Sequence, residues 1–182
     1  MARLLRQNPQ PRPVQSLMKS LILFLILVMC IAVQGAAQAE APETSGLPLP
    51  RFASLKSDNV YVRAGPSMDY PIRWVYKREG LPVEITQEFD AWRKIVDPEG
   101  EGGWVHKILL SSGRRAKVSA TDGPVTVYRE AEMVHPLVKF EQGVVVDVDE
   151  CRKLFCHVTF PPYSGWIEKK SLWGVYGSEI FN

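Results

Sequence analysis

The sequence lacks several common catalytic motifs. It has no glycine-rich phosphate loop, no serine in a nucleophile elbow and no paired-carboxylate motif. Its three histidines, His106, His135 and His157, are scattered along the chain, with no carboxylate or cysteine at metal-ligand spacing. These absences argue against an enzyme, and we expect a non-catalytic protein without a metal or other cofactor.

Long apolar runs are also missing. The longest runs from Leu21 to Val33 and has 13 residues, whereas a membrane-spanning helix needs about 20. Four basic residues and no acid precede this run, and the small residues Ala37-Gln38-Ala39 follow it. This pattern is typical of a cleaved signal peptide. We therefore expect residues 1–39 to be removed between Ala39 and Glu40, with no permanent membrane anchor, and the mature protein to be periplasmic or secreted.

The mature chain has no large excess of charge of one sign. The full sequence has 22 basic and 20 acidic residues, and the signal peptide holds 4 of the basic ones, which leaves 18 against 20. Residues 51–118 have 12 basic and 9 acidic side chains, and residues 119–182 have 6 and 9. Charges this small and interleaved are typical of a solvated surface. Nucleic acid is therefore not indicated as a partner.

Helical periodicity is absent from the mature chain as well. Residues 40–50 contain three prolines among small residues and are expected to form a disordered tether. Beyond them, short runs with alternating apolar residues, such as "LPVEIT" and "VVVDVD", are separated by glycine and proline. This pattern predicts an all-β protein with a strand about every ten residues.

The short runs recur as an internal repeat. Gly80, Trp92 and Trp104 are spaced 12 and 12 residues apart, and Gly143, Phe155 and Trp166 follow at 12 and 11. The pairs "GLPVEI" and "GVVVDV", and "GGWVHKILL" and "SGWIEKKSLW", match in the same order. The repeat predicts two similar domains, copy 1 (residues 51–111) and copy 2 (residues 119–177), joined by a hydrophilic linker (residues 112–118).

Two cysteines, Cys151 and Cys156, remain after signal cleavage. In an oxidising compartment such a pair favours a structural disulfide, and the C-x4-C spacing suits two strands of a hairpin. Two free buried thiols, or a metal or redox pair, are the alternatives that the residues leave open.

Copy 1 resembles the bacterial version of the Src-homology-3 (SH3) domain. The resemblance rests on the segment from Arg63 to Ser67, on Tyr70-Pro71 and on Gly103-Trp104-Val105. Copy 1 departs from the family pattern at Tyr61, where asparagine is usual. Copy 2 matches more loosely, since Glu130-Ala131-Glu132 replaces the Gly-Pro-Ser turn. The resemblance implies that each copy is a small SH3-like β-barrel.

The family's groove lies between the first long loop and the hairpin loop before the tryptophan strand. Carried over by position, this resemblance implies a copy 1 groove bordered by Asp69, Tyr70, Glu88, Asp90 and Trp92. Trp92 is the leading candidate for a ligand anchor, although a tryptophan that begins a strand can equally pack over the barrel end. Copy 1 has no cluster of tyrosines, so recognition of proline-rich peptides does not follow.

Two classes of function remain open. The first is an envelope-binding module that recognises peptidoglycan peptides or an exported protein. The second is a structural or assembly subunit whose two barrels pack together or self-associate.

Overall fold

The computed structural model describes residues 43–120 and 122–182. The predicted signal peptide and its cleavage site at Ala39 and Glu40 lie outside these residues. Within them, the secondary structure consists of β-strands and two short 3-10 helices, η1 and η2. No helix in this part of the chain is long and apolar enough to cross a membrane.

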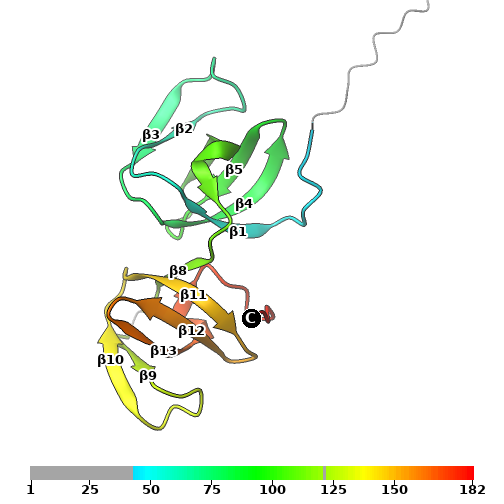
Figure 1. Ribbon diagram of the computed structural model, residues 1–182. Coiled ribbons are helices and arrows are strands. Elements are labelled where there is room, and N and C mark those ends of the chain that lie inside the picture. The colour runs from blue at the N-terminus through cyan, green and yellow to red at the C-terminus, as the bar shows by residue number, and fades with distance from the viewer. Residues whose placement is uncertain (1–42, 121) are drawn as a thin grey trace, which may run out of the picture. The chain divides into compact units, whose positions relative to one another are not determined.

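The first barrel is a sheet of seven strands, drawn from cyan to green in Figure 1. The chain runs through β1 (Arg51–Leu55), β2 (Val60–Arg63), β3 (Ile72–Tyr76), β4 (Pro82–Phe89), β5 (Trp92–Val96), β6 (Gly102–His106), η1 (Lys107–Leu109) and β7 (Leu110–Ser111). The order of strands across the sheet is β3-β2-β6-β5-β4-β1-β7. The long loop between β2 and β3 corresponds to the first long loop, which borders the groove in the family resemblance.

The second barrel repeats this arrangement strand for strand. It contains β8 (Arg115–Val118), β9 (Val125–Tyr128), β10 (Pro136–Phe140), β11 (Val145–Cys151), β12 (Phe155–Phe160), β13 (Tyr163–Glu168), η2 (Lys169–Ser171) and β14 (Leu172–Trp173). The order across the sheet is β10-β9-β13-β12-β11-β8-β14, so each strand has the neighbours of its counterpart in the first barrel. The predicted fold class, two tandem SH3-like barrels, is confirmed.

Strand alternation builds each core. In β4 and the residue before it, Leu81, Val83 and Ile85 are buried as the "LPVEIT" pattern predicts. In the second barrel, Val146 and Val148 of β11 are buried in the same way. Each barrel has its own hydrophobic cluster, because the inward residues of one sheet pack mainly on one another.

The glycine that precedes each closing-strand tryptophan lets two strands cross closely. A Cβ on Gly103 would lie 2.8 Å from the carbonyl oxygen of Arg63, and one on Gly165 would lie 2.4 Å from that of Tyr128. No side chain fits in either place, since real Cβ contacts are longer. The Gly-Trp motif therefore marks where β2 meets β6 and where β9 meets β13.

Two predicted boundaries shift in the structure. The linker predicted over residues 112–118 is shorter, because residues 115–118 form β8, which pairs with β11 and β14. Ala116 and Val118 in this strand are fully buried. The predicted tether is fixed at one point, since the backbone nitrogen and hydroxyl of Ser45 donate hydrogen bonds to Glu88 at 2.6 and 2.7 Å.

Residues of the two barrels also contact one another. The ring of Phe52 in β1 lies 5.0 Å from the ring of Trp173 and 4.6 Å from that of Tyr176, measured between centroids. The hydroxyl of Tyr176 donates a hydrogen bond to Glu84 at 2.8 Å. Burial, together with this bond to a carboxylate, raises the pKa of Tyr176 above its ordinary value.

Candidate functional site

The loop between β2 and β3 is held in place by Arg63, the last residue of β2, and by close packing at Gly65. The guanidinium of Arg63, through Nη1, donates hydrogen bonds to the carbonyl oxygens of Met68 and Tyr70 at 3.0 and 2.7 Å. Gly65 lies under the ring of Tyr70, where a Cβ would come within 2.6 Å of three ring carbons. The arginine and glycine of the family motif thus shape this loop.

A groove lies beside this loop, with a volume of about 360 Å³. We call it the Trp92 groove. Its walls come from β2, the loop, the start of β5, the end of β6 and η1, which are brought together by the order of strands in the sheet. The lining residues are Tyr61, Arg63, Met68, Trp92, His106, Ile108 and Leu109.

Trp92 forms part of this groove while being mostly buried. Only 8% of its surface is exposed. Its ring meets that of His106 edge to face, with 5.5 Å between the centroids. The two residues are paired across β5 and β6, so the sheet itself fixes their contact. Trp92 is therefore a mostly buried residue that also lines the groove, and its role as a ligand anchor stays a prediction.

Exposed apolar side chains surround Trp92. Met68 is 69% exposed, Ile108 is 66% exposed and Tyr61 is 45% exposed. Scattered apolar residues on a surface need no explanation, but several around one concavity indicate a binding surface. Arg63 and His106 are the polar members, and Arg63 is already bonded to the loop. The groove is thus suited to an apolar group of a ligand.

Four residues of the groove, Tyr61, Met68, His106 and Ile108, are not among the site residues predicted from the sequence. Tyr61 stood out only as a departure from the family pattern, and Ile108 follows the "GGWVH" strand in a turn that has no periodicity. A single exposed apolar residue gives no sequence signal of its own. Their convergence depends on the way the sheet folds.

Two predicted residues, Asp69 and Tyr70, lie in the loop but do not line the groove. Asp69 accepts a hydrogen bond from the Ser67 hydroxyl at 2.8 Å. The ring of Tyr70, close to half exposed, covers Gly65. Both follow Met68 within two residues in the sequence, and their role in binding stays a prediction.

The structure does not bring the predicted acid Glu88 to the groove. Its side chain is 2% exposed and lies between Arg51 and Arg93, with N to O distances of 2.5 and 3.1 Å. Burial opposes its ionisation, but the hydrogen bonds from Ser45 and Arg51 outweigh burial and lower the pKa of Glu88 to about 2. Glu88 joins β4, β5, β1 and the segment before β1.

The remaining predicted acid, Asp90, forms the tight turn between β4 and β5. Its φ of 50° is in the left-handed region, which aspartate tolerates better than most residues. Its carbonyl oxygen accepts a hydrogen bond from Arg93 at 2.8 Å. Asp90 does not line the Trp92 groove.

In the second barrel, a histidine lies within hydrogen-bonding distance of an aspartate on one side and a serine on the other. His157 lies 3.1 Å from Asp149 through Nδ1 and 3.3 Å from the Ser164 hydroxyl through Nε2. The three residues stand on the neighbouring strands β11, β12 and β13, and Thr159 bonds to both Asp149 and Ser164. All these bonds are exposed. We interpret these bonds as a cross-strand network that supports the sheet.

Sequence comparison decides the family. The sequence profile described as "Bacterial SH3 domain" matches residues 56–112 and 121–174, which together make up more than half of the chain. This protein belongs to the bacterial SH3 domain family. Each match covers one of the two barrels, so copy 2 is a bacterial SH3 domain in spite of its altered turn. No curated protein matches the chain.

Comparison with solved structures gives distant similarities. They include NlpC2 from Trichomonas vaginalis, with 14% identity, a TM-score of 0.32 and coverage of 68% of this chain and 48% of that one. NlpC1 from the same organism has 14% identity, a TM-score of 0.31 and coverages of 72% and 48%. An NlpC/P60 family protein from Bacillus cereus has 10% identity, a TM-score of 0.30 and coverages of 67% and 55%.

The bacterial SH3 chain thus matches about half of the length of each of these proteins. At this level the similarity indicates neither a shared ligand nor a shared activity. The family itself is informative in a coarser way, because bacterial SH3 domains are typically binding modules of cell-wall proteins.

Proposed function

We propose that this protein is a non-catalytic binding module of the bacterial cell envelope, and that its first barrel holds a peptide in the Trp92 groove. The observation that carries the proposal is the set of exposed apolar side chains, Tyr61, Met68 and Ile108, around the edge of Trp92. Membership of a family of binding modules supports it.

The chemistry of the groove limits the ligand. Its lining is mainly apolar, and aromatic anchors of this kind often dominate binding energy. The ligand is therefore a peptide that inserts an apolar side chain, from peptidoglycan or from an exported protein. Because Glu88 is occupied by Arg51 and Arg93, an amine on the ligand would have to meet Asp69 instead.

The predicted export signal supports an envelope location. Residues 1–39 have the composition of a cleaved signal peptide, and domains of this family occur in cell-envelope proteins. We propose that the mature protein is periplasmic or secreted, without a permanent membrane anchor and without a nucleic-acid partner.

Exposed residues give the sharpest test of the groove. Ile108→Glu should weaken retention on purified cell-wall sacculi, or on an exported partner, by at least about 1 kcal/mol, because it places a charge where an apolar group should dock. The side chain of Ile108 is largely exposed, so the variant should fold normally. Co-sedimentation with sacculi measures retention, and thermal unfolding measures whether the variant folds normally.

Leu47→Glu is the matched control, since Leu47 is 57% exposed and lies outside the groove. It should bind like the wild type. Equal retention of Ile108→Glu and the wild type would refute the groove. Trp92→Ala is less decisive, because removing a buried tryptophan also costs about 3–5 kcal/mol of stability.

One observation favours the alternative, a structural subunit whose barrels pack together or self-associate. Phe52 of the first barrel contacts Trp173 and Tyr176 of the second. If neither sacculi nor envelope proteins retain the wild type, and its mass by size-exclusion chromatography with light scattering is a multiple of the chain mass, the structural role replaces the binding role.

A further inference from the structure

A second cavity lies in the second barrel, with a volume of about 510 Å³. Its walls come from the turn between β11 and β12, from η2 and from the segment after β14. We call it the lysine pocket. Three of its members are lysines, Lys153, Lys169 and Lys170, and apolar side chains that include Leu154, Leu172 and Val175 line it as well.

The charge of this pocket is opposite to that of the surrounding barrel. Residues 119–182 contain 6 basic and 9 acidic side chains, a net charge of −3. Three of these six basic residues line the pocket, but only one of the nine acids, Glu168, does so. Glu168 forms an ion pair with Lys170 at 2.7 Å. The lining therefore has a net charge of +2, from three lysines and one glutamate.

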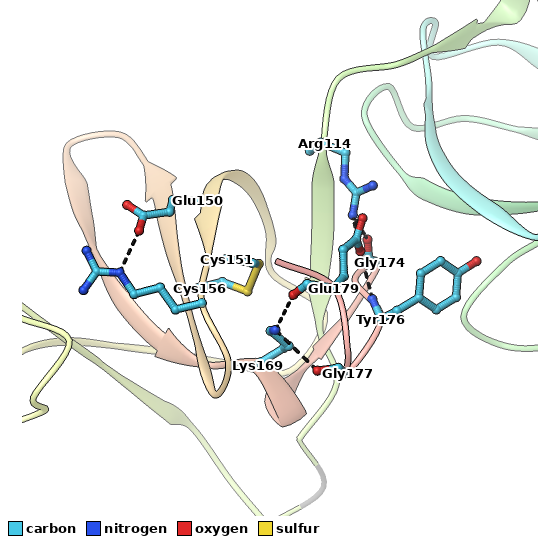
Figure 2. The surroundings of a disulfide bond; sticks show 10 residues. Arg114, Glu150, Cys151, Cys156, Lys169, Gly174, Tyr176, Gly177 and Glu179 are labelled. Atoms are coloured by element: carbon cyan, nitrogen blue, oxygen red, sulfur yellow. Dashed lines mark hydrogen bonds and ion pairs between the residues drawn. A yellow bond between two sulfur atoms is a disulfide. The ribbon is translucent and has the colours of Figure 1, made fainter. Parts of the chain in front are cut away.

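Lys169 is the buried member of the three. It is only 5% exposed. Its ammonium nitrogen Nζ donates hydrogen bonds to the carbonyl oxygens of Gly177 and Glu179 at 3.4 and 2.6 Å (Figure 2). The carboxylate of Glu179 pairs instead with Arg114, at 2.7 Å. Backbone carbonyls are dipoles without a full charge, so these partners leave the charge of Lys169 uncompensated.

An uncompensated buried charge is costly, and an anion placed beside it lowers that cost. The apolar half of the lining narrows the choice of anion. Inorganic phosphate would leave Leu154, Leu172 and Val175 without a partner, whereas a molecule with one carboxylate and one apolar side chain fills both halves. A volume of about 510 Å³ falls within the range of small-ligand pockets, about 300–1,000 Å³.

We propose that the lysine pocket binds the C-terminal carboxylate of a peptide that ends in an apolar residue. The lysines hold the carboxylate and the apolar wall holds the last side chain. This site is separate from the Trp92 groove, since the two cavities share no lining residue. Its test therefore stands whether or not the groove binds a ligand.

The experiment titrates two matched probes into the exported protein with both barrels intact. The first is acetyl-Ala-Leu with a free carboxylate, and the second is the same dipeptide with a C-terminal amide. Backbone NMR resonances of Leu154 and Lys169 report on binding. The free acid should bind at least about tenfold more tightly than the amide, because a hydrogen bond to a charged group is stronger than one to a neutral group.

Substitutions at the rim separate binding from folding. The double variant Lys153→Gln, Lys170→Gln should weaken binding of the free acid at least about tenfold, since it removes two positive charges. Leu154→Glu should abolish binding, because Leu154 is 62% exposed and a carboxylate there repels the ligand. Lys139→Gln is the control, because Lys139 is an exposed lysine of the same barrel that does not line the pocket.

Four results would overturn the proposal. The first is that the amide binds as tightly as the acid. The second is that neither probe shifts the pocket resonances at about 10 mM, a concentration well above the dissociation constants of specific sites. The third is that Lys139→Gln weakens binding as much as the double variant does. Inorganic phosphate at the same concentration is the last probe, and it should compete weakly with the free acid. Phosphate binding without binding of the acid would also overturn it.

Discussion

At the scale of single residues, Glu88 shows how burial changes the role of a charged side chain. The sequence places it near the groove by resemblance, yet the structure surrounds its carboxylate with Arg51, Arg93 and Ser45. The surrounding donors favour the charged form, so protonation of Glu88 is coupled to folding. Protonation of Glu88 at low pH is therefore expected to lower the free energy of unfolding.

The sign of this coupling follows from the lowered pKa. The pKa of Glu88 falls from the ordinary 4.5 to about 2 in the folded protein, so its contribution is present above pH 5 and is lost as the pH falls toward 2. That contribution is about 3 kcal/mol at neutral pH. Glu88→Gln should lower the free energy of unfolding at pH 7 and make it less dependent on pH between 5 and 2. Urea unfolding at several pH values measures both effects.

Glu101→Gln is the control for this prediction, because Glu101 is exposed and its carboxylate forms none of the ion pairs of the described residues. Its pH dependence should match the wild type. If Glu88→Gln loses stability between pH 5 and 2 as steeply as the wild type, the ion pairs do not hold the carboxylate in its charged form.

Some of the candidate site residues can be predicted from the sequence and others cannot. Trp92 was predicted because the family resemblance carries the groove over to the start of the tryptophan strand. Met68 and Ile108 were not, since exposed apolar residues in loops have no distinguishing pattern. Lys169 was not either, because its burial comes from the chain segment after β14, which the sequence does not place. The residues that were missed are those whose exposure or burial depends on segments distant in the sequence.

At the scale of elements, the hairpin of β11 and β12 organises one end of the second barrel. Its two strands face each other at Cys151 and Cys156, which are joined by a disulfide, as the C-x4-C spacing predicts. Both backbone groups of Cys151 also bond to Phe181, at 2.8 and 3.0 Å. The C-terminal segment therefore docks on the disulfide hairpin, which Figure 2 shows beside Lys169 and Glu179.

Removal of this disulfide should destabilise the second barrel selectively. A variant with Cys151→Ala and Cys156→Ala should lose about 2 kcal/mol in the chain-entropy model for so short a loop. Amide hydrogen exchange measured by mass spectrometry should become faster in β11, β12 and the segment around Phe181, while the strands of the first barrel keep their rates. Uniformly faster exchange in both barrels would show that the hairpin does not act locally.

The elements were more predictable than the boundaries. Alternation in "LPVEIT" and "VVVDVD" identified β4 and β11, because their inward residues lie in one core. The residues of β8 were predicted to be linker because "SSGRRAK" is hydrophilic. Ala116 is buried through the pairing of β8 with β11, which the local sequence does not indicate. The residues after β14 have no period at all, and their place is fixed by contacts with Cys151 and Lys169.

At the scale of the whole molecule, the predicted export would link folding to oxidation. A disulfide forms and persists outside the cytosol, where thiols are not kept reduced. The signal peptide predicted over residues 1–39 would deliver the chain to such a compartment. There the bridge between Cys151 and Cys156 fixes the hairpin on which the C-terminal segment docks, and that segment forms one wall of the lysine pocket.

This link predicts the state of the exported protein. Its intact mass should correspond to a chain that begins at Glu40 and lacks the two thiol hydrogens of Cys151 and Cys156, because cleavage after Ala39 and oxidation both follow export. The same chain produced without residues 1–39 in a reducing cytosol should keep both thiols and exchange its C-terminal segment faster. A full-length chain in the inner membrane would contradict cleavage. Two titratable thiols in the unfolded exported chain would contradict oxidation, and the lysine pocket would then have to form without the bridge.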